Sequence, residues 1–196
     1  MWFTIKSVNK VQHIQANIRN ISANCVISSK LIKFDNLALS YIQDFTTIFA
    51  DMEDNEKYMR EALREAGYAA AEDEVPIGAV IVCRGRIVGK GHNMTERLND
   101  PTAHAEMIAI TAATEALGGK YLNECTLYVT VEPCPMCAGA LAWSQIGKVV
   151  YGASDPKRGF SMFSPSLMHP KTEVVSGILA SECGDLVTEF FRKKRA

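Results

Sequence analysis

Apolar positions along this chain follow two spacings, and the change from one to the other predicts its secondary structure. Met59, Leu63 and Ala66 show the helical spacing of the first segment, in which apolar residues return every three or four positions. The segments that predict helices span residues 54–72, 103–117, 135–144 and 182–194. Compact apolar runs predict strands at residues 77–83, 86–90, 126–131, 148–151 and 173–176.

The order of these segments predicts an α/β fold. A short turn containing Arg84 and Gly85 joins the first two strands as a hairpin. Helices separate the second, third and fourth strands, with Gly118 ending one helix and Pro135 beginning the next, and a long loop joins the last two strands. An αββαβαββα order indicates a mixed sheet with helices on both faces.

The first fifty residues differ in composition from the rest. They are rich in Ile, Asn, Ser and Lys, and their only acids are Asp35 and Asp44. The acid-rich run after Met52 is typical of a helix start. We therefore expect an N-terminal extension over residues 1–51 and one domain over residues 52–196. The extension has three open interpretations: a start assigned too early, with Met52 the true initiator; a genuine, disordered extension; or a targeting peptide.

Composition narrows the class of protein. With 196 residues, 47% of them hydrophobic, the chain is long enough for one domain with a core. A net charge of −1 argues against binding a polyanion along the whole surface, although Arg192–Arg195 form a basic run. No apolar run approaches the ~18 residues of a membrane span. Of six cysteines, two stand in a Cys-x-x-Cys motif that favours a metal and a reducing compartment. We expect a soluble cytoplasmic protein.

Two short motifs carry the candidate chemistry. Thr102-Ala-His104-Ala-Glu106 and Glu132-Pro-Cys134-Pro-Met-Cys137 together supply one imidazole, two thiols and a free carboxylate. This set is typical of a catalytic zinc site that keeps one coordination position open for water. Cys134 and Cys137 stand three apart, so their side chains face the same way. They also stand at a helix start, and a helix N-terminus favours the thiolate over the thiol. His104 and Glu106 point about 200° apart on an ideal helix, so they converge only where the chain is not yet regular.

Other uses of the Cys-x-x-Cys motif fit less well. A zinc ribbon needs a second such motif, which this chain lacks, and a redox pair does not need the His-x-Glu. Cys125 begins the strand that leads to Cys134, and an extended run of that length spans about 25 Å, too far for a shared metal. We therefore expect the remaining cysteines to be small buried hydrophobes: Cys25, Cys83, Cys125 and Cys183.

Glu106 suits general acid–base work. Two thiolates and a neutral imidazole leave zinc close to formally neutral, so it needs help in ionising its water. A carboxylate beside the metal can take the proton of that water and pass it on to the substrate.

Several stretches match one family. They are Glu74–Ala79, Gly91–Asn93, Asp100–Glu106, Leu127–Ala140, Val150–Asp155, Gly177–Cys183 and Phe190–Arg192. In these stretches residues 53–195 resemble the bacterial tRNA-specific adenosine deaminases of the cytidine and deoxycytidylate deaminase superfamily. The resemblance implies a cytidine deaminase-like, three-layer α/β/α sandwich around a mixed five-stranded sheet, one zinc per subunit and a homodimer. It also implies hydrolytic deamination of the wobble adenosine to inosine in a tRNA anticodon stem-loop, by a zinc-activated water.

The resemblance also implies roles for individual residues. His104, Cys134 and Cys137 would bind zinc, and Glu106 would be the proton shuttle. Asn93 would bond the flipped base, although it also fits a turn residue at a strand end. The remaining candidates for substrate contact are backbone groups at Ala105, Pro133 and Cys134, and Asp155 in a loop against the nucleotide backbone.

The chain departs from the family pattern over residues 158–167. Extra aromatic residues here, Phe160 and Phe163, either stack on RNA bases or pack the loop onto the core. Basic residues are our candidates for phosphate contacts: Lys157, Arg158, Arg192, Lys193 and Arg195.

Three rival functions share parts of this pattern. A free-base or nucleoside deaminase, acting on guanine or on cytosine or cytidine, would share the whole zinc site. A noncatalytic RNA-binding subunit would usually lack the shuttle carboxylate, and a structural zinc module would need a fourth ligand. The stretch around Val129–Cys134 and the basic terminal helix favour the tRNA enzyme.

Overall fold

The computed structural model describes residues 36–163 and 167–195, with side chains from Asp51 onward. Contacts divide the chain between Thr47 and Ile48, and the unit from Ile48 to Ala196 contains the whole sheet. Residues 1–35 of the predicted extension, with Cys25, lie outside the described residues, whereas residues 36–51 belong to the helix α2 (Asn36–Ala71). The boundary at residue 52 stays a prediction.

A mixed five-stranded sheet forms the centre of this unit. Its strands are β1 (Gly78–Cys83), β2 (Arg86–His92), β3 (Cys125–Val131), β4 (Lys148–Ala153) and β5 (Glu173–Ser176). The strand order is β2-β1-β3-β4-β5. β1 is antiparallel to both β2 and β3, whereas β3, β4 and β5 are parallel to one another. Each strand matches its predicted position to within two residues at either end.

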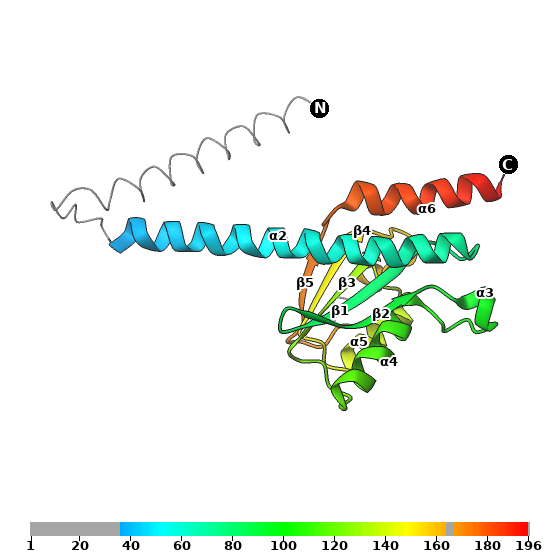
Figure 1. Ribbon diagram of the computed structural model, residues 1–196, viewed down its shortest axis with the longest axis horizontal. Helices are drawn as coiled ribbons and strands as arrows, with labels where there is room; N and C mark the ends of the chain where they lie inside the picture. The colour runs from blue at the N-terminus through cyan, green and yellow to red at the C-terminus, as the bar shows by residue number, and fades with distance from the viewer. Residues whose placement is uncertain (1–35, 164–166, 196) are drawn as a thin grey trace, which may run out of the picture. The chain divides into compact units, whose positions relative to one another are not determined.

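Helices cover both faces of the sheet, as Figure 1 shows. α4 (Ala105–Leu117) and α5 (Pro135–Trp143) pack on one face, around buried residues such as Ala109, Leu127 and Leu141. On the other face, α2 (Asn36–Ala71) and α6 (Ala180–Lys194) enclose a second cluster that includes Met59, Tyr128 and Cys183. The predicted α/β sandwich is confirmed, because alternate residues of each strand serve the two clusters.

Three features of the fold differ from the sequence prediction. α2 spans Asn36–Ala71, so its predicted start at residue 54 is wrong. No glycine or proline interrupts residues 36–66, so the acids after Met52 continue an existing helix instead of opening a new one. α3 (Thr95–Leu98) and a 3₁₀ turn, η1 (Phe160–Met162), were not predicted, because a single turn has no apolar periodicity to detect.

The direction of the strands decides where a site is built on such a sheet. β2, β3, β4 and β5 all run the same way, so their carboxyl ends meet at one edge, beside the start of β1. Ligands of open α/β sheets typically bind at this edge. α4 lies very close to β2: a Cβ atom on Gly91 would collide with the backbone of Ala105 and Ala109. This contact fixes the start of α4, where the His-x-Glu motif stands.

Candidate metal centre

Three side chains converge at the strand-end edge to form a metal-binding group. His104 Nδ1 lies 3.6 Å from Cys134 Sγ and 3.5 Å from Cys137 Sγ. All three donor atoms lie within 4.8 Å of one another, and no other group of this kind exists among the described residues. Tetrahedral zinc with ordinary Zn–N and Zn–S bonds requires nitrogen and sulfur ligands about 3.5 Å apart. The donor set and its spacing therefore fit zinc.

Helix starts place these donors. His104 and Cys134 are the N-cap residues of α4 and α5, both in extended conformation, and neither side chain caps its own helix. Cys137 follows in the first turn of α5 and is fully buried. His104 is extended and not yet helical, whereas Glu106 is the second residue of α4. The two side chains therefore need not point about 200° apart, as they would if both residues were helical. Two helix N-termini facing one site also favour thiolate over thiol.

The two thiols hold their protons unequally. The hydrogen bond from Cys137, with that from His104, lowers the pKa of Cys134 to about 4 despite its burial. The same Cys134 contact, followed by burial, raises the pKa of Cys137. One sulfur is therefore already a thiolate, the form that binds metal.

Glu106 lies beside the cysteines with only 4% of its surface exposed. Burial, the largest influence, raises the pKa of Glu106 to about 7, and the neighbouring Cys134 acts in the same direction. A carboxyl group that titrates near neutral pH is suited to accept and return a proton.

Asn93 follows β2 at the same edge and is 4% exposed. Met94 N donates to Ala103 O at 3.0 Å, so the chain after β2 lies against the chain just before His104. The Asn93 amide nitrogen donates to Glu74 Oε2 and to Thr95 Oγ1, both at 3.1 Å. Glu74 opens one of the stretches that carry the family resemblance, but its spacing from Asn93 along the chain did not predict this contact.

A second buried acid, Glu132, holds the loop after β4. Its Oε2 accepts a hydrogen bond from Asp155 N and its Oε1 accepts one from Ser161 N, each at 3.0 Å. Asp155 Oδ1 in turn accepts the backbone N–H groups of Lys157 and Arg158. Glu132 is the first residue of the Glu-Pro-Cys motif, but the motif alone did not indicate this role.

The two aromatic residues of this loop have different surroundings. Phe160 is 6% exposed and meets the Tyr151 ring edge-on at 6.3 Å, which supports packing for this residue. Phe163 is 61% exposed and is available to a ligand. Phe160 N also donates to Pro133 O at 2.9 Å, tying the loop to the start of α5.

The other predicted contact residues are distributed around this edge and on α6. Ala105 is fully buried at the first position of α4. Lys157 and Arg158 are exposed in the loop after β4. On α6, Arg192 and Lys193 are exposed and pair with Glu189, and Arg195 follows the helix end.

The remaining cysteines lie away from the metal centre. Cys125 is buried at the start of β3, paired in register with Cys83 of β1, at the end of the sheet opposite Cys134. Cys183 is fully buried under α6. Cys83 is only half-buried, because it ends β1 next to the exposed hairpin turn, so its predicted burial is wrong in degree.

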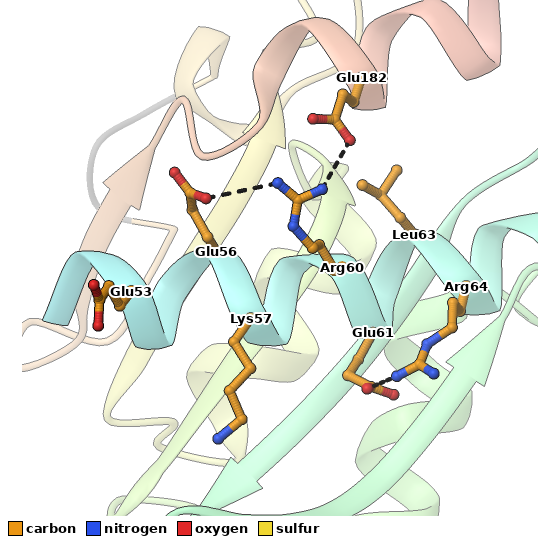
Figure 2. A pocket seen from close by; sticks show the side chains of 8 residues that line it. All are labelled: Glu53, Glu56, Lys57, Arg60, Glu61, Leu63, Arg64 and Glu182. Atoms are coloured by element: carbon orange, nitrogen blue, oxygen red, sulfur yellow. Dashed lines mark hydrogen bonds and ion pairs between the residues drawn. The ribbon is translucent and has the colours of Figure 1, made fainter. Parts of the chain in front are cut away.

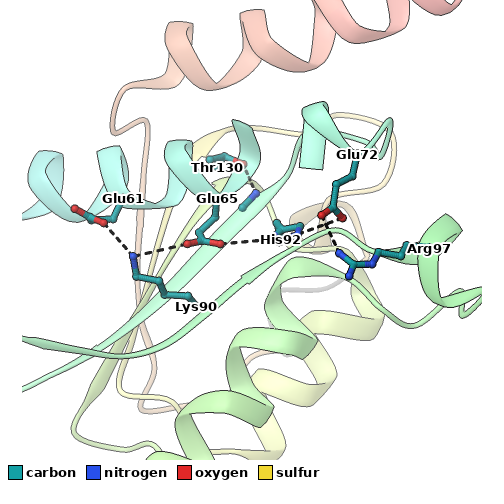
Figure 3. Close-up of polar contacts among 8 residues, drawn as sticks. Glu61, Glu65, Glu72, Lys90, His92, Arg97 and Thr130 are labelled. Atoms are coloured by element: carbon teal, nitrogen blue, oxygen red, sulfur yellow. Dashed lines mark hydrogen bonds and ion pairs between the residues drawn. The ribbon is translucent and has the colours of Figure 1, made fainter. Parts of the chain in front are cut away.

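Two charged regions near α2 contain none of the metal ligands. A surface hollow is lined by residues of α2 and by Glu182, and Figure 2 shows Arg60 bridging Glu56 and Glu182. Figure 3 shows His92 between Glu65, at 3.3 Å, and Glu72, at 3.7 Å. These polar contacts join α2 to α6 and to β2.

Comparison with known proteins adds independent information. The family model for the cytidine and deoxycytidylate deaminase zinc-binding region matches residues 52–153. A tRNA-specific adenosine deaminase of Bacillus subtilis is 48% identical over 149 residues, covering 74% of this chain and 92% of the relative. One of Agrobacterium fabrum is 45% identical over 149 residues, covering 74% of this chain and 98% of the relative.

Solved structures agree. A structure from a study of A-to-I editing by tRNA:A34 deaminases at the wobble position matches with a TM-score of 0.62 and 44% identity, covering 66% of this chain and 98% of the other. A guanine deaminase of Nitrosomonas europaea matches with a TM-score of 0.63 but 25% identity, covering 69% of this chain and 83% of the other.

Proposed function

The chain belongs to the tRNA-specific adenosine deaminases of the cytidine and deoxycytidylate deaminase family, and we propose that it converts the wobble adenosine of tRNA to inosine. The observation that carries this proposal is the buried carboxylate of Glu106 beside the His104–Cys134–Cys137 group, in a chain nearly half identical to tRNA deaminases. The guanine deaminase is a more distant neighbour.

The residues divide the work of hydrolysis among them. His104 Nδ1, Cys134 Sγ and Cys137 Sγ would hold the zinc, which when bound would supply Lewis acidity. Glu106 accepts a proton from the attacking water and transfers it to a ring nitrogen of the base; it then accepts the remaining proton of the added hydroxyl and transfers it to the departing amine. Asn93 orients the flipped base by a hydrogen bond from its fixed position after β2. The backbone at Ala105, Pro133 and Cys134 lines the attacked carbon.

The substrate and the partner follow from the same family. We propose the tRNA anticodon stem-loop as the substrate, because a base in a loop is extruded at less cost than one in a duplex. Asp155 and the basic candidate residues contact its backbone, and a tRNA substrate implies a cytoplasmic location. Within the described residues, no helix combines the length and the apolar character needed to cross a membrane.

A second copy of the chain is the proposed partner at the α5 face. Trp143 is 86% exposed and Met136 is 37% exposed on this helix, and Met162 of the nearby loop is 57% exposed. Exposed aromatic and methionine side chains on one surface are typical of protein interfaces. We also propose that residues 52–196 form the deaminase domain, which the family match to residues 52–153 supports.

An inosine assay tests the activity directly. Transcripts of tRNA with a wobble adenosine are incubated with the full chain, with guanine and cytidine as parallel substrates. We expect inosine only at the wobble position, and a loss of about 10²- to 10⁴-fold in Glu106→Gln with zinc retained. Ammonia release from guanine or cytidine, with the tRNA unchanged, would keep the hydrolytic chemistry and overturn the proposed substrate.

A further inference from the structure

We propose that Glu74 is a positioning residue that holds Asn93 in one orientation, with its amide nitrogen toward the protein and its carbonyl Oδ1 free to accept a hydrogen bond from the nucleotide. The proposal deepens the proposed function and rests on it, because Asn93 is assigned to the substrate by that function. Glu74 itself does not touch the substrate.

Glu74 is a fully buried acid whose hydrogen bonds all come from the protein. Its Oε1 accepts Arg97 N at 2.8 Å. Its Oε2 accepts Thr95 Oγ1 at 3.2 Å and Asn93 Nδ2 at 3.1 Å. Burying a carboxylate is costly unless donors surround it, and here two side chains and the backbone at the start of α3 provide them. All of these donors belong to the segment that follows β2.

The carboxyl group is ionised, which limits what it can bond. Burial acts to raise the pKa of Glu74, but hydrogen bonds from the Arg97 and Glu96 backbone and from two side chains outweigh it and hold the pKa below its usual value. An ionised carboxylate accepts hydrogen bonds and donates none. The Asn93 atom that faces Glu74 is therefore the nitrogen, because the oxygen would meet another acceptor.

Thr95 removes the remaining freedom of the amide. Its hydroxyl has a single hydrogen, which it donates to Glu74 Oε2, so toward Asn93 Nδ2 the same oxygen acts as acceptor. Both hydrogens of Nδ2 are then used. Among the residues that the structure describes, no group donates a hydrogen bond to Asn93 Oδ1. This oxygen is also not one of the buried polar atoms that lack a partner, so it is open to a ligand. The free end of Asn93 is an acceptor.

An acceptor in this position recognises an N–H or O–H group of the flipped nucleotide. Two groups supply that chemistry, the exocyclic amine of adenine and the 2′-hydroxyl of its ribose. Because Asn93 lies beside the chain that leads into His104, either donor would be held close to the metal centre. By orienting Asn93, Glu74 thus determines that this side chain binds a donor group of the nucleotide and not an acceptor group.

Paired isosteric variants test the orientation. Glu74→Gln replaces one acceptor oxygen by an NH₂ group, so either Arg97 N or the Asn93–Thr95 pair loses its acceptor. Asn93→Asp keeps an acceptor for the substrate but sets a second carboxylate against Glu74. The double variant Glu74→Gln/Asn93→Asp restores a matched pair with donor and acceptor exchanged. We expect each single change to lower kcat/KM on tRNA by about 10- to 100-fold, and the double variant to recover at least about tenfold over Asn93→Asp.

Glu72→Gln is the matched control. Glu72 bonds the same residue, Arg97, but through its side chain at 2.8 Å on the surface, as Figure 3 shows. It does not touch Asn93, so we expect kcat/KM to stay within about twofold of the unchanged protein.

Nuclear magnetic resonance of the Asn93 side-chain amide separates orientation from catalysis. The signal pair is identified by its absence in Asn93→Asp. In the unchanged protein we expect slow solvent exchange of both hydrogens, and in Glu74→Gln faster exchange of at least one. Thr95→Val serves as a second variant if Glu74→Gln does not fold, and it should speed exchange of one hydrogen only.

The outcomes are distinct. Unchanged exchange in the folded variants, or no recovery in the double variant, would overturn the role of Glu74. If the unchanged protein forms no inosine but shows the expected exchange pattern, the proposed function is wrong and the proposed orientation of Asn93 still holds. An anticodon stem-loop with 2′-deoxyadenosine at the wobble position identifies the donor: insensitivity of this substrate to Asn93→Asp points to the ribose hydroxyl, and retained sensitivity to the amine.

Discussion

The reacting centre and the region that supports it both contain buried carboxylates, but in opposite surroundings. In the reacting centre (His104, Glu106, Cys134 and Cys137), burial dominates and raises the pKa of Glu106 to about 7. In the supporting region (Glu74, Asn93, Thr95, Glu132 and the loop 155–161), each acid is saturated by donors. A buried carboxylate therefore fixes geometry where donors surround it, and exchanges protons where they do not.

This contrast predicts that substitutions in the two regions have different effects. Changes in the reacting centre should remove chemistry while the fold survives. Changes in the supporting region should disturb how the substrate is held while the metal stays bound. The following experiments test that separation.

The largest effect is expected from removing a metal ligand. Cys137→Ser should abolish zinc binding and with it inosine formation, because an alcohol replaces a thiolate in a site of three protein ligands. Zinc content by atomic absorption and the inosine assay check this. Cys125→Ala is the matched control: it is equally buried but lies at the other end of the sheet, so zinc and activity should remain. Zinc retained in Cys137→Ser would remove Cys137 from the ligand set.

Glu106→Gln should leave the metal and the fold in place. The amide has nearly the same shape, so we expect full zinc content and an unfolding midpoint within about 3 °C of the unchanged protein, alongside the activity loss given above. Differential scanning calorimetry measures the midpoint. Loss of zinc in this variant would mean that Glu106 supports the ligands structurally, and the contrast between the two regions would fail.

Gly159→Ala should disturb the supporting loop. A Cβ atom here would collide with the carboxylate of Glu132, which is buried and bonded at both oxygens, so the loop must shift. We expect KM for tRNA to rise by about three- to tenfold at unchanged zinc content. Gly184→Ala on α6 is the control, because its Cβ would make only an ordinary 3.7 Å contact with Ala153. Equal kinetics in both variants would show that the loop does not position the substrate.

The two loop phenylalanines should separate stability from binding. Phe163→Ala should weaken tRNA binding by about fivefold or more if its exposed ring stacks on a base, with the unfolding midpoint unchanged. Phe160→Leu should instead lower the midpoint by several degrees, because a buried ring packed on Tyr151 is lost. Fluorescence titration of a labelled stem-loop and calorimetry measure the two quantities. The reverse pattern would exchange their roles.

The smallest expected effect concerns acid stability. The pKa of Glu74 is lower in the folded chain than its usual 4.5, so its ionised form stabilises the fold above that pH. This contribution is lost as the pH falls below 4.5 toward the folded-state pKa. The midpoint of the unchanged protein should therefore drop more between pH 6 and pH 4 than that of Glu74→Gln, by about 2 °C or more. Parallel pH curves for the two proteins would contradict this.

The sequence by itself determined the local features of this protein. Strand and helix positions followed from apolar spacing, and the four residues of the reacting centre stood in two short motifs. Both signals lie within a few neighbouring positions, which is why one chain read alone was enough for the fold class and the zinc chemistry. The motifs did not prove that His104 and Glu106 converge; the extended N-cap conformation of His104 made that possible.

Only the tertiary structure decided how the site is supported. Glu74 meets Asn93 across 19 positions of chain, and Glu132 meets Ser161 across 29, because the ends of separate strands come together at one edge of the sheet. The same packing buried Phe160 and left Phe163 exposed, although both belong to one aromatic run. The partners of a buried polar group depend on which distant segments of the chain pack together, and the spacing of residues along the chain does not predict that packing.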